Sequence, residues 1–175
     1  MEIGDSISGA LFSDENRRFR YALWRIWEKS KDALLFIGLN PSTANDIHDD
    51  PTIIRLVNFA KSWGYGGIYA GNLFSIVSAN PEILFFQACT EQLEGPNNMA
   101  IRKMRELTSI VLVGWGEWGK NAGKRPDAVL ALLGEPVFCL KVNQSGESCH
   151  PLYLPKDSKL IRYKRCCQEV LELKI

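Results

Sequence analysis

The sequence predicts an α/β protein, a three-layer sandwich in which helices flank a central, mostly parallel sheet of four or five strands. Short apolar runs alternate along the chain with longer amphipathic stretches, which is typical of strands joined by crossover helices. Runs such as Ala33-Leu34-Leu35-Phe36-Ile37 are almost continuously apolar, as expected for strands that are covered on both faces.

Four strands are expected, over residues 33–38, 67–72, 109–114 and 136–142. Residues 11–28 fit two descriptions, because their apolar positions suit either an edge strand or one face of a helix.

The clearest helix start is Asp50-Pro51, because an acidic N-cap followed by proline favours the first helical turn. Ile53, Ile54 and Val57 then recur at helical spacing, and Gly64-Tyr65-Gly66-Gly67 ends the helix after about Trp63. Further helices are predicted over residues 80–90, 97–107, 119–133 and 157–172.

Composition indicates one domain spanning residues 1–175. A chain of 175 residues with 46% hydrophobic and 23% charged residues is ordinary for a compact domain. The first residues have neither the basic start nor the apolar core of a signal peptide, and no apolar run reaches membrane-spanning length. We therefore expect a cytoplasmic, monomeric protein without a membrane partner.

The five cysteines are odd in number and contain no C-x-x-C pair, so they indicate reduced structural thiols. No cofactor or metal is expected from them.

The net charge of +1 does not by itself indicate a nucleic-acid partner. Two basic clusters exist, and by themselves they are interpreted as solvated faces. The early cluster is Arg17, Arg18, Arg20 and Arg25, and the late one is Lys156, Lys159, Arg162, Lys164 and Arg165.

Unusual residues gather where the predicted strands end. In an open α/β sheet, ligands bind outside the carboxyl ends of the strands. Each residue has an ordinary structural explanation when taken alone, but four loops that converge indicate a site. Its candidates are Asn40, Pro41 and Ser42 after the first strand, Asn72 and Phe74 after the second, Trp115 and Gly116 after the third, and His150 after the fourth.

These motifs resemble the uracil-DNA glycosylase superfamily over roughly residues 33–155. Gly38-Leu39-Asn40-Pro41 is similar to the first motif of that superfamily, in its branch with Asn rather than Asp, and His150-Pro151-Leu152-Tyr153-Leu154 is similar to its last motif. Segments 67–74 and 110–116 resemble the strands between them, in the same order. The sequence around these motifs also resembles a bacterial and phage family known only as a domain of unknown function.

The resemblance implies a DNA glycosylase, which hydrolyses the bond between a flipped-out base and its sugar. Asn40 would orient the attacking water, and His150 would donate a hydrogen bond to the departing base. Asn72 would read the base edge, and Phe74 or Trp115 would stack on the base.

The same resemblance implies double-stranded DNA as the partner. Leu154 matches the position of the wedge that fills the gap left by the flipped base, with Leu152 and Tyr153 beside it. Four residues of the late basic cluster would hold phosphates: Lys156, Lys159, Arg162 and Arg165.

The first catalytic loop leaves three interpretations open. Asn cannot take a proton from water, so one of Asp46, His48, Asp49 and Asp50 in the same loop could supply the base, with Asp46 and Asp50 as the chosen candidates. The alternatives are a helix cap at Asp50 with a solvated acidic turn, or a metal site that lacks an identifiable fourth ligand.

The substrate is expected to be a modified pyrimidine, such as glucosylated hydroxymethylcytosine of phage DNA. Its removal would serve antiviral defence, whereas a deaminated or damaged base would indicate DNA repair by base excision.

Two other functions stay open from the sequence. The loop Gly114–Lys120 matches G-x-G-x-x-G and most of a phosphate-binding loop, which would indicate a nucleotide-binding protein or a small-nucleotide hydrolase. Asn121 stands where that loop needs Ser or Thr, which weakens the match. The third possibility is an inactive relative that only binds DNA.

Overall fold

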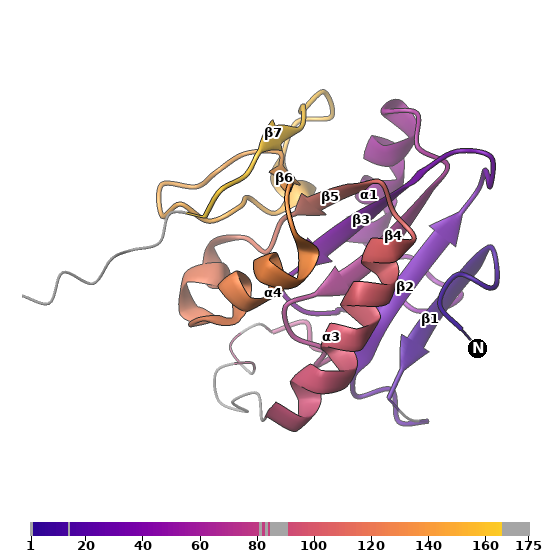
Figure 1. Ribbon diagram of the computed structural model, residues 1–175, viewed down its shortest axis with the longest axis horizontal. Coiled ribbons are helices and arrows are strands. Elements are labelled where there is room, and N and C mark those ends of the chain that lie inside the picture. The colour runs from indigo at the N-terminus through magenta and orange to yellow at the C-terminus, as the bar shows by residue number, and fades with distance from the viewer. Residues whose placement is uncertain (1, 14, 81, 83, 85–90, 166–175) are drawn as a thin grey trace, which may run out of the picture.

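The α/β class is confirmed, but the sheet is larger and less parallel than expected. A computed structural model describes residues 2–13, 15–80, 82, 84 and 91–165. In this part of the chain, seven strands form one mixed sheet in the order β1-β2-β4-β3-β5-β6-β7 (Figure 1). The strands are β1 (Ser8–Phe12), β2 (Arg20–Ile26), β3 (Ala33–Gly38), β4 (Gly67–Asn72), β5 (Ile110–Val113), β6 (Phe138–Cys139) and β7 (Ile161–Arg162).

The four predicted strands form the parallel centre of the sheet. β4, β3, β5 and β6 run parallel to one another, with Leu35 of β3 opposite Tyr69 of β4 and Val111 of β5. The prediction of a mostly parallel sheet was wrong because antiparallel strands extend both edges. β1 and β2 add to β4 on one side, and β7 adds to β6 on the other.

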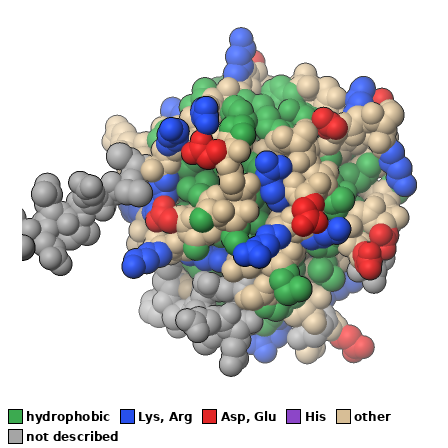
Figure 2. Space-filling model, viewed as in Figure 1, with side chains coloured by type: hydrophobic (Ala, Val, Ile, Leu, Met, Phe, Trp, Pro, Cys, Tyr) green, Lys and Arg blue, Asp and Glu red, His purple; other side chains and the backbone are tan. Residues whose placement is uncertain are grey.

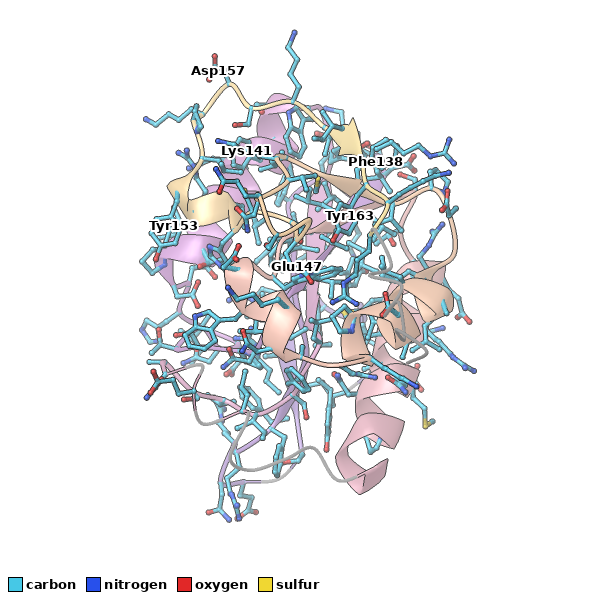
Figure 3. All side chains as sticks on the ribbon, turned by 90° about the vertical axis from the view of Figure 1, so that its left-hand side faces the viewer. Phe138, Lys141, Glu147, Tyr153, Asp157 and Tyr163 are labelled. Carbon is cyan, nitrogen blue, oxygen red and sulfur yellow. The ribbon has the colours of Figure 1, made fainter. Side chains whose placement is uncertain are left out.

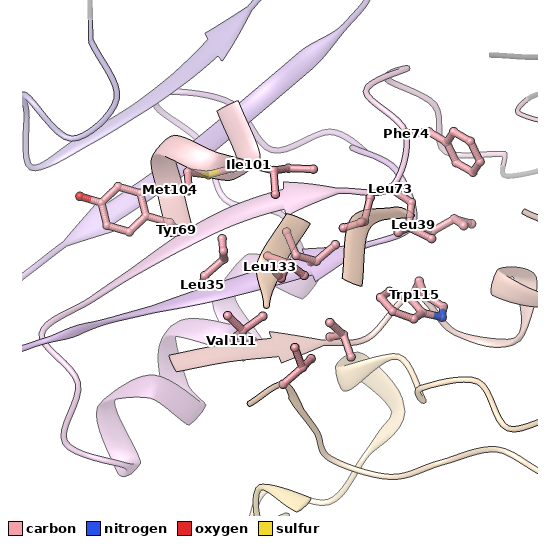
Figure 4. Packing of buried hydrophobic residues seen from close by; sticks show 14 of the residues in the cluster. Leu35, Leu39, Tyr69, Leu73, Phe74, Ile101, Met104, Val111, Trp115 and Leu133 are labelled. Carbon is pink, nitrogen blue, oxygen red and sulfur yellow. The ribbon is translucent and has the colours of Figure 1, made fainter. Parts of the chain in front are cut away.

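Helices cover both faces of the sheet. The helix α1 (Pro51–Ser62) packs on one face, and α3 (Glu91–Glu106) and α4 (Arg125–Leu133) pack on the face nearest the viewer in Figure 1. Alternate residues of β3 point into the two cores, since Leu34 and Phe36 contact the cluster under α1. Leu35 and Ile37 join the larger cluster with Ile101 and Met104 of α3 (Figure 4).

The start of α1 follows the predicted capping chemistry. Asp50 is the N-cap and its Oδ1 accepts the N–H of Ile53 at 2.9 Å, while Pro51 occupies the first turn. Such a cap stabilises a helix by about 1 kcal/mol. Trp63 is the C-cap, and Gly64 follows in the left-handed region at φ 85°. Both ends of this helix are therefore confirmed.

Residues 11–28 contain the end of β1, a turn and β2, so the strand interpretation was correct for the second half, but β2 lies between β1 and β4 and is not an edge strand. Ala22, Leu23 and Trp24 are buried because β2 is flanked by β1 and β4 and its side chains enter both cores.

One helix prediction was only partly correct, and another was wrong. Residues 119–133 divide into the 3₁₀ helix η1 (Glu117–Asn121) and α4, with Gly123 at φ 57° between them. The described part of 157–172 contains β7 instead of a helix, because its backbone pairs with β6 and Tyr163 N donates to Val137 O at 2.8 Å. The helix predicted over 80–90 lies mostly outside the described residues.

The surface carries mixed charge. Figure 2 shows positive and negative side chains interspersed over the face seen in Figure 1. No helix in the described part of the chain combines the length and apolar character needed to cross a membrane. Cys139 and Cys149 are free thiols, and the other three cysteines lie outside the described residues.

Candidate functional site

A cavity of about 590 Å³ opens at the carboxyl ends of the parallel strands. The chain leaves β3 toward β4 through α1 on one face and returns toward β5 through α3 on the other face. Loops that diverge in this way leave a crevice between them. The predicted residues that line it are Asn40, Ser42, Asp50, Asn72, Trp115, Gly116, His150, Leu152, Tyr153 and Leu154. The predicted meeting of the four loops is therefore confirmed.

Asn40 is held in one orientation by the backbone around it. Its Nδ2 donates to the carbonyl oxygens of Pro41, Ile76 and Ser78 at 3.0, 3.3 and 2.8 Å. Among the described residues, its Oδ1 accepts no hydrogen bond. The amide therefore offers an oxygen acceptor to the cavity and has no donor to spare.

His150 has a defined tautomer in its neutral form. Its Nδ1 accepts the N–H of Leu152 at 3.3 Å, so the proton of the neutral ring is on Nε2. Burial of the imidazole lowers the pKa of His150, and the carboxylate of Asp50 opposes that shift. The ring is thus a neutral N–H donor near pH 7.

Of the two predicted acidic residues, only Asp50 reaches the cavity. Asp50 is buried, and its Oδ1 is already used by the helix cap. Asp46 is paired on the surface with Arg17 at 2.8 Å and does not line the cavity. Asp50 is therefore the carboxylate of this loop that can act on a bound ligand.

Asn72 ends β4 and lies against the end of β3. A Cβ atom on Gly38 would be 2.9 Å from Asn72 Oδ1, so only glycine leaves room for this amide. Asn72 is 5% exposed, and its Nδ2 has no hydrogen-bond partner among the described residues. Phe74, two residues later, packs in the core and does not line the cavity.

Trp115 is anchored in the wall of the cavity. It is 1% exposed, its Nε1 donates to Glu147 Oε2 at 2.6 Å, and its ring meets Tyr163 edge-on at 5.7 Å. Figure 4 shows the indole just beyond the end of β5, at the margin of the core cluster. These contacts leave the ring little freedom to stack on a ligand.

The loop Gly114–Lys120 differs from a phosphate-binding loop in its packing. It leads into the five-residue 3₁₀ helix η1 and not into an α-helix. A Cβ on Gly119 would be 2.3 Å from the indole of Trp115, and Lys120 is paired with Glu117 at 3.0 Å. This arrangement does not favour the nucleotide-binding interpretation.

The segment after His150 forms the rim of the cavity. Leu152, Tyr153 and Leu154 follow it in and after the 3₁₀ helix η2 (Pro151–Tyr153), and Tyr153 is 83% exposed. Figure 3 shows Tyr153 pointing outward from this segment. Arg55 of α1 donates to Leu154 O, which ties the segment to the helix. In the first loop, Pro41 is buried beside the cavity and Ser42 lines it.

The predicted phosphate contacts fall into two groups. Lys156 and Lys159 are exposed and have no ion pair in the described part of the chain. Arg162 pairs with Glu135 at 2.7 Å, and Arg165 pairs with Asp127 at 2.6 Å and with buried Glu147 at 2.7 Å. The guanidinium of Arg165 is therefore already engaged by two carboxylates of the protein.

The metal interpretation gains no support from the acidic loop. Asp46 and Asp49 pair with Arg17 and Arg25, and Asp50 caps α1. Within the described residues, no three His, Cys, Asp or Glu side chains are grouped in a way that could hold a metal ion.

Sequence reasoning missed several residues of the cavity. Arg20 was interpreted as part of a solvated cluster, but it is 4% exposed and lines the cavity, because β2 lies inside the sheet and not at its edge. Burial raises the pKa of the Cys149 thiol, whose Sγ donates to Asn143 Oδ1 at 2.7 Å, so it is not an activated nucleophile. Others on the wall are Thr52, Ser78 and Lys141, which carry no motif, and Glu117 and Trp118, which belong to the loop Gly114–Lys120.

Comparisons with known proteins add a family and no activity. No curated protein and no solved structure matches the chain. Nothing in them links it to the uracil-DNA glycosylases. The model of the family described as "Protein of unknown function (DUF1643)" matches residues 20–152, so the chain belongs to that family, and the resemblance to a domain of unknown function is confirmed.

Proposed function

We propose that this protein is a DNA glycosylase that hydrolyses the N-glycosidic bond of a flipped-out, modified pyrimidine and leaves an abasic site. The observation that carries the proposal is that Asn40 and His150, which are far apart in the sequence, line one cavity. A volume of about 590 Å³ lies within the usual range for small-ligand sites and is large enough for an everted nucleotide.

The two side chains offer the chemistry that this reaction needs. Cleavage develops positive charge on the sugar and negative charge on the departing base. His150 supplies a neutral Nε2–H, which can donate to an acceptor of the base as its charge grows. Asn40 supplies a fixed Oδ1, which can accept a hydrogen bond from the attacking water.

Asp50 is the general base in this scheme. Its carboxylate lines the same cavity and interacts electrostatically with His150, and it can take the proton that water loses. Asp46 has no such access because it lies outside the cavity in an ion pair with Arg17.

The rim of the cavity suits a base-flipping enzyme. Unstacking a base costs a few kcal/mol, and a side chain that fills the gap recovers part of it. Tyr153 protrudes beside the cavity, with Leu152 and Leu154 on either side. Lys156 and Lys159 follow in the chain and are free to contact phosphates.

A base-release assay tests the proposal. Purified protein is incubated with unmodified, uracil-containing and glucosyl-hydroxymethylcytosine-containing duplexes. Abasic sites are then scored by alkaline cleavage, and the free base is identified by mass spectrometry. We expect release from the modified duplex, reduced roughly 100-fold or more by His150→Gln and by Asn40→Ala.

His48→Gln is the matched control, because His48 is the other histidine of the chain and is exposed outside the cavity. Absence of release from all three duplexes would refute the proposal. Full activity in folded His150→Gln would refute the role of His150.

A further inference from the structure

Arg20 is a buried cation in the cavity that the proposed reaction does not use. It begins β2, and its Nη1 donates to Ala44 O at 2.6 Å. Its Nε is buried and has no hydrogen-bond partner among the described residues. An unsatisfied N–H on a buried guanidinium is costly, so a missing acceptor is the simplest explanation.

Asn72 presents a second unsatisfied donor close to the first. β2 and β4 are neighbouring strands, and Arg20 N donates to Ser75 O, just beyond the end of β4. Both Arg20 and Asn72 line the cavity, and both have a buried donor without a partner in the described structure. Two such donors on adjacent strands indicate a ligand with two acceptor atoms.

Asp50 supplies an acceptor to the same region. Burial lowers the pKa of Arg20 to about 10, and the Asp50 carboxylate opposes that shift. The two side chains, both fully described, form no direct ion pair. Asp50 Oδ2 accepts no hydrogen bond among the described residues. Arg20 and Asp50 carry opposite charges, and each has an unused hydrogen-bonding atom. A polar ligand without net charge therefore fits this region better than a phosphate, which the Asp50 carboxylate would repel.

We propose that Arg20 and Asn72 form a subsite that binds the hydrogen-bonding edge of a pyrimidine base. Arg20 Nε and Asn72 Nδ2 donate to two acceptor atoms of the base, and Asp50 beside them stays available for the attacking water. The choice of a base as ligand rests on the proposed function. The positive guanidinium also stabilises negative charge that develops on the base. Arg20 is then a binding residue that stabilises the departing base together with His150.

The test measures binding of free bases, without any reaction. Cytosine, 5-hydroxymethylcytosine, uracil and inorganic phosphate are titrated into the purified protein by calorimetry. We expect at least one base to bind, and Arg20→Met to weaken that binding roughly tenfold or more. Replacing a buried ion by an apolar side chain of similar size commonly preserves the fold.

Arg25→Met is the matched control. Arg25 lies on the same strand, but its guanidinium is bonded to Asp49 and to the carbonyl oxygens of Asn45 and Trp24, and it does not line the cavity. Its substitution should leave the Kd of the base unchanged.

A second readout does not depend on a variant. The Nε–H resonance of Arg20 in the ¹⁵N spectrum of the wild-type protein should shift when the base is added. The subsite is refuted if no base binds, if phosphate alone binds, or if the base binds without moving the Arg20 resonance.

Binding and release separate the two proposals. A free base that binds through Arg20, with no base released from any DNA, supports the subsite and refutes the glycosylase. Base release that Arg20→Met leaves unchanged refutes the subsite and leaves the glycosylase standing.

Discussion

Asn72 Oδ1 lies against the α-carbon of Gly38, at a place where a methyl group on that glycine would be 2.9 Å from the amide oxygen. The two residues end adjacent parallel strands and are directly paired in register. The amide of Asn72 can therefore occupy this position in the cavity only because residue 38 has no side chain.

Gly38→Ala should disturb the site more than the fold. The atom in the way is the end of a side chain, so Asn72 can rotate aside at modest cost, but its amide then loses its place. We expect base release, measured in the duplex assay, to fall roughly tenfold through the loss of one hydrogen bond.

The control for that variant is Gly71→Ala. The residue precedes Asn72 in β4, and its added methyl would meet the flexible end of Met104 in the opposite core. Similar losses of activity in the two variants at equal stability would contradict the positional role of Gly38.

Asn40→Asp should destabilise the protein, although an acidic residue at this position can accept a proton from water and an amide cannot. Nδ2 of Asn40 donates to three carbonyl oxygens, and a carboxylate would place a charged acceptor against them. We expect the free energy of unfolding to fall by on the order of 2–3 kcal/mol, measured by urea denaturation.

Asn45→Asp is the matched control in the same loop. The Oδ1 of Asn45 accepts the N–H groups of Ile47 and His48, both at 2.8 Å, and a carboxylate can accept both. This variant should unfold at nearly the wild-type urea concentration. An equally stable Asn40→Asp protein would show that the amide is not fixed by its three carbonyl partners.

The centre of the fold could be predicted because its signals are local. The apolar runs of β3, β4 and β5 and the Asp50-Pro51 start of α1 depend on residues close in sequence. The antiparallel edges could not be predicted in the same way. β7 exists because residues 161–162 pair with β6, and that long-range pairing outweighs a local apolar spacing that also suits a helix.

The candidate site shows the same division. Asn40, Asn72 and His150 follow strands whose carboxyl ends meet, so their convergence could be predicted from chain order. Arg20 could not be found, because an arginine in a basic run gives no sign that its strand lies inside the sheet. Arg165 also belongs to a basic run, and its burial against Glu147 depends on a contact between distant segments.

Glu147→Ala should be among the most destabilising substitutions of a polar residue. Glu147 is buried and accepts hydrogen bonds from Trp115 Nε1 at 2.6 Å and from Arg165 Nη2 at 2.7 Å. Its removal leaves an indole N–H and a guanidinium without this partner. We expect a loss of about 3 kcal/mol in the free energy of unfolding.

Glu135→Ala is its control, since it removes another Arg–Glu pair, with Arg162, whose side chains are both exposed. That pair should contribute less than about 1 kcal/mol to stability. Equal losses in the two variants would contradict the anchoring of the cavity wall by Glu147.

The pH dependence of stability should report on His150. Burial lowers the pKa of this imidazole below its ordinary value of 6.5, so as the pH falls the unfolded chain takes up the proton first. The stability contributed by neutral His150 is therefore present above about pH 6.5 and is lost as the pH falls through the lower pKa of the folded state. Melting temperatures between about pH 5 and 7 should show this loss, and His150→Gln should flatten it. His48→Gln serves as the matched control, since His48 is exposed and does not line the cavity. The NMR signal of His150 is the histidine signal that remains in His48→Gln. A pKa above 6.5 for that signal would contradict a neutral donor at this position.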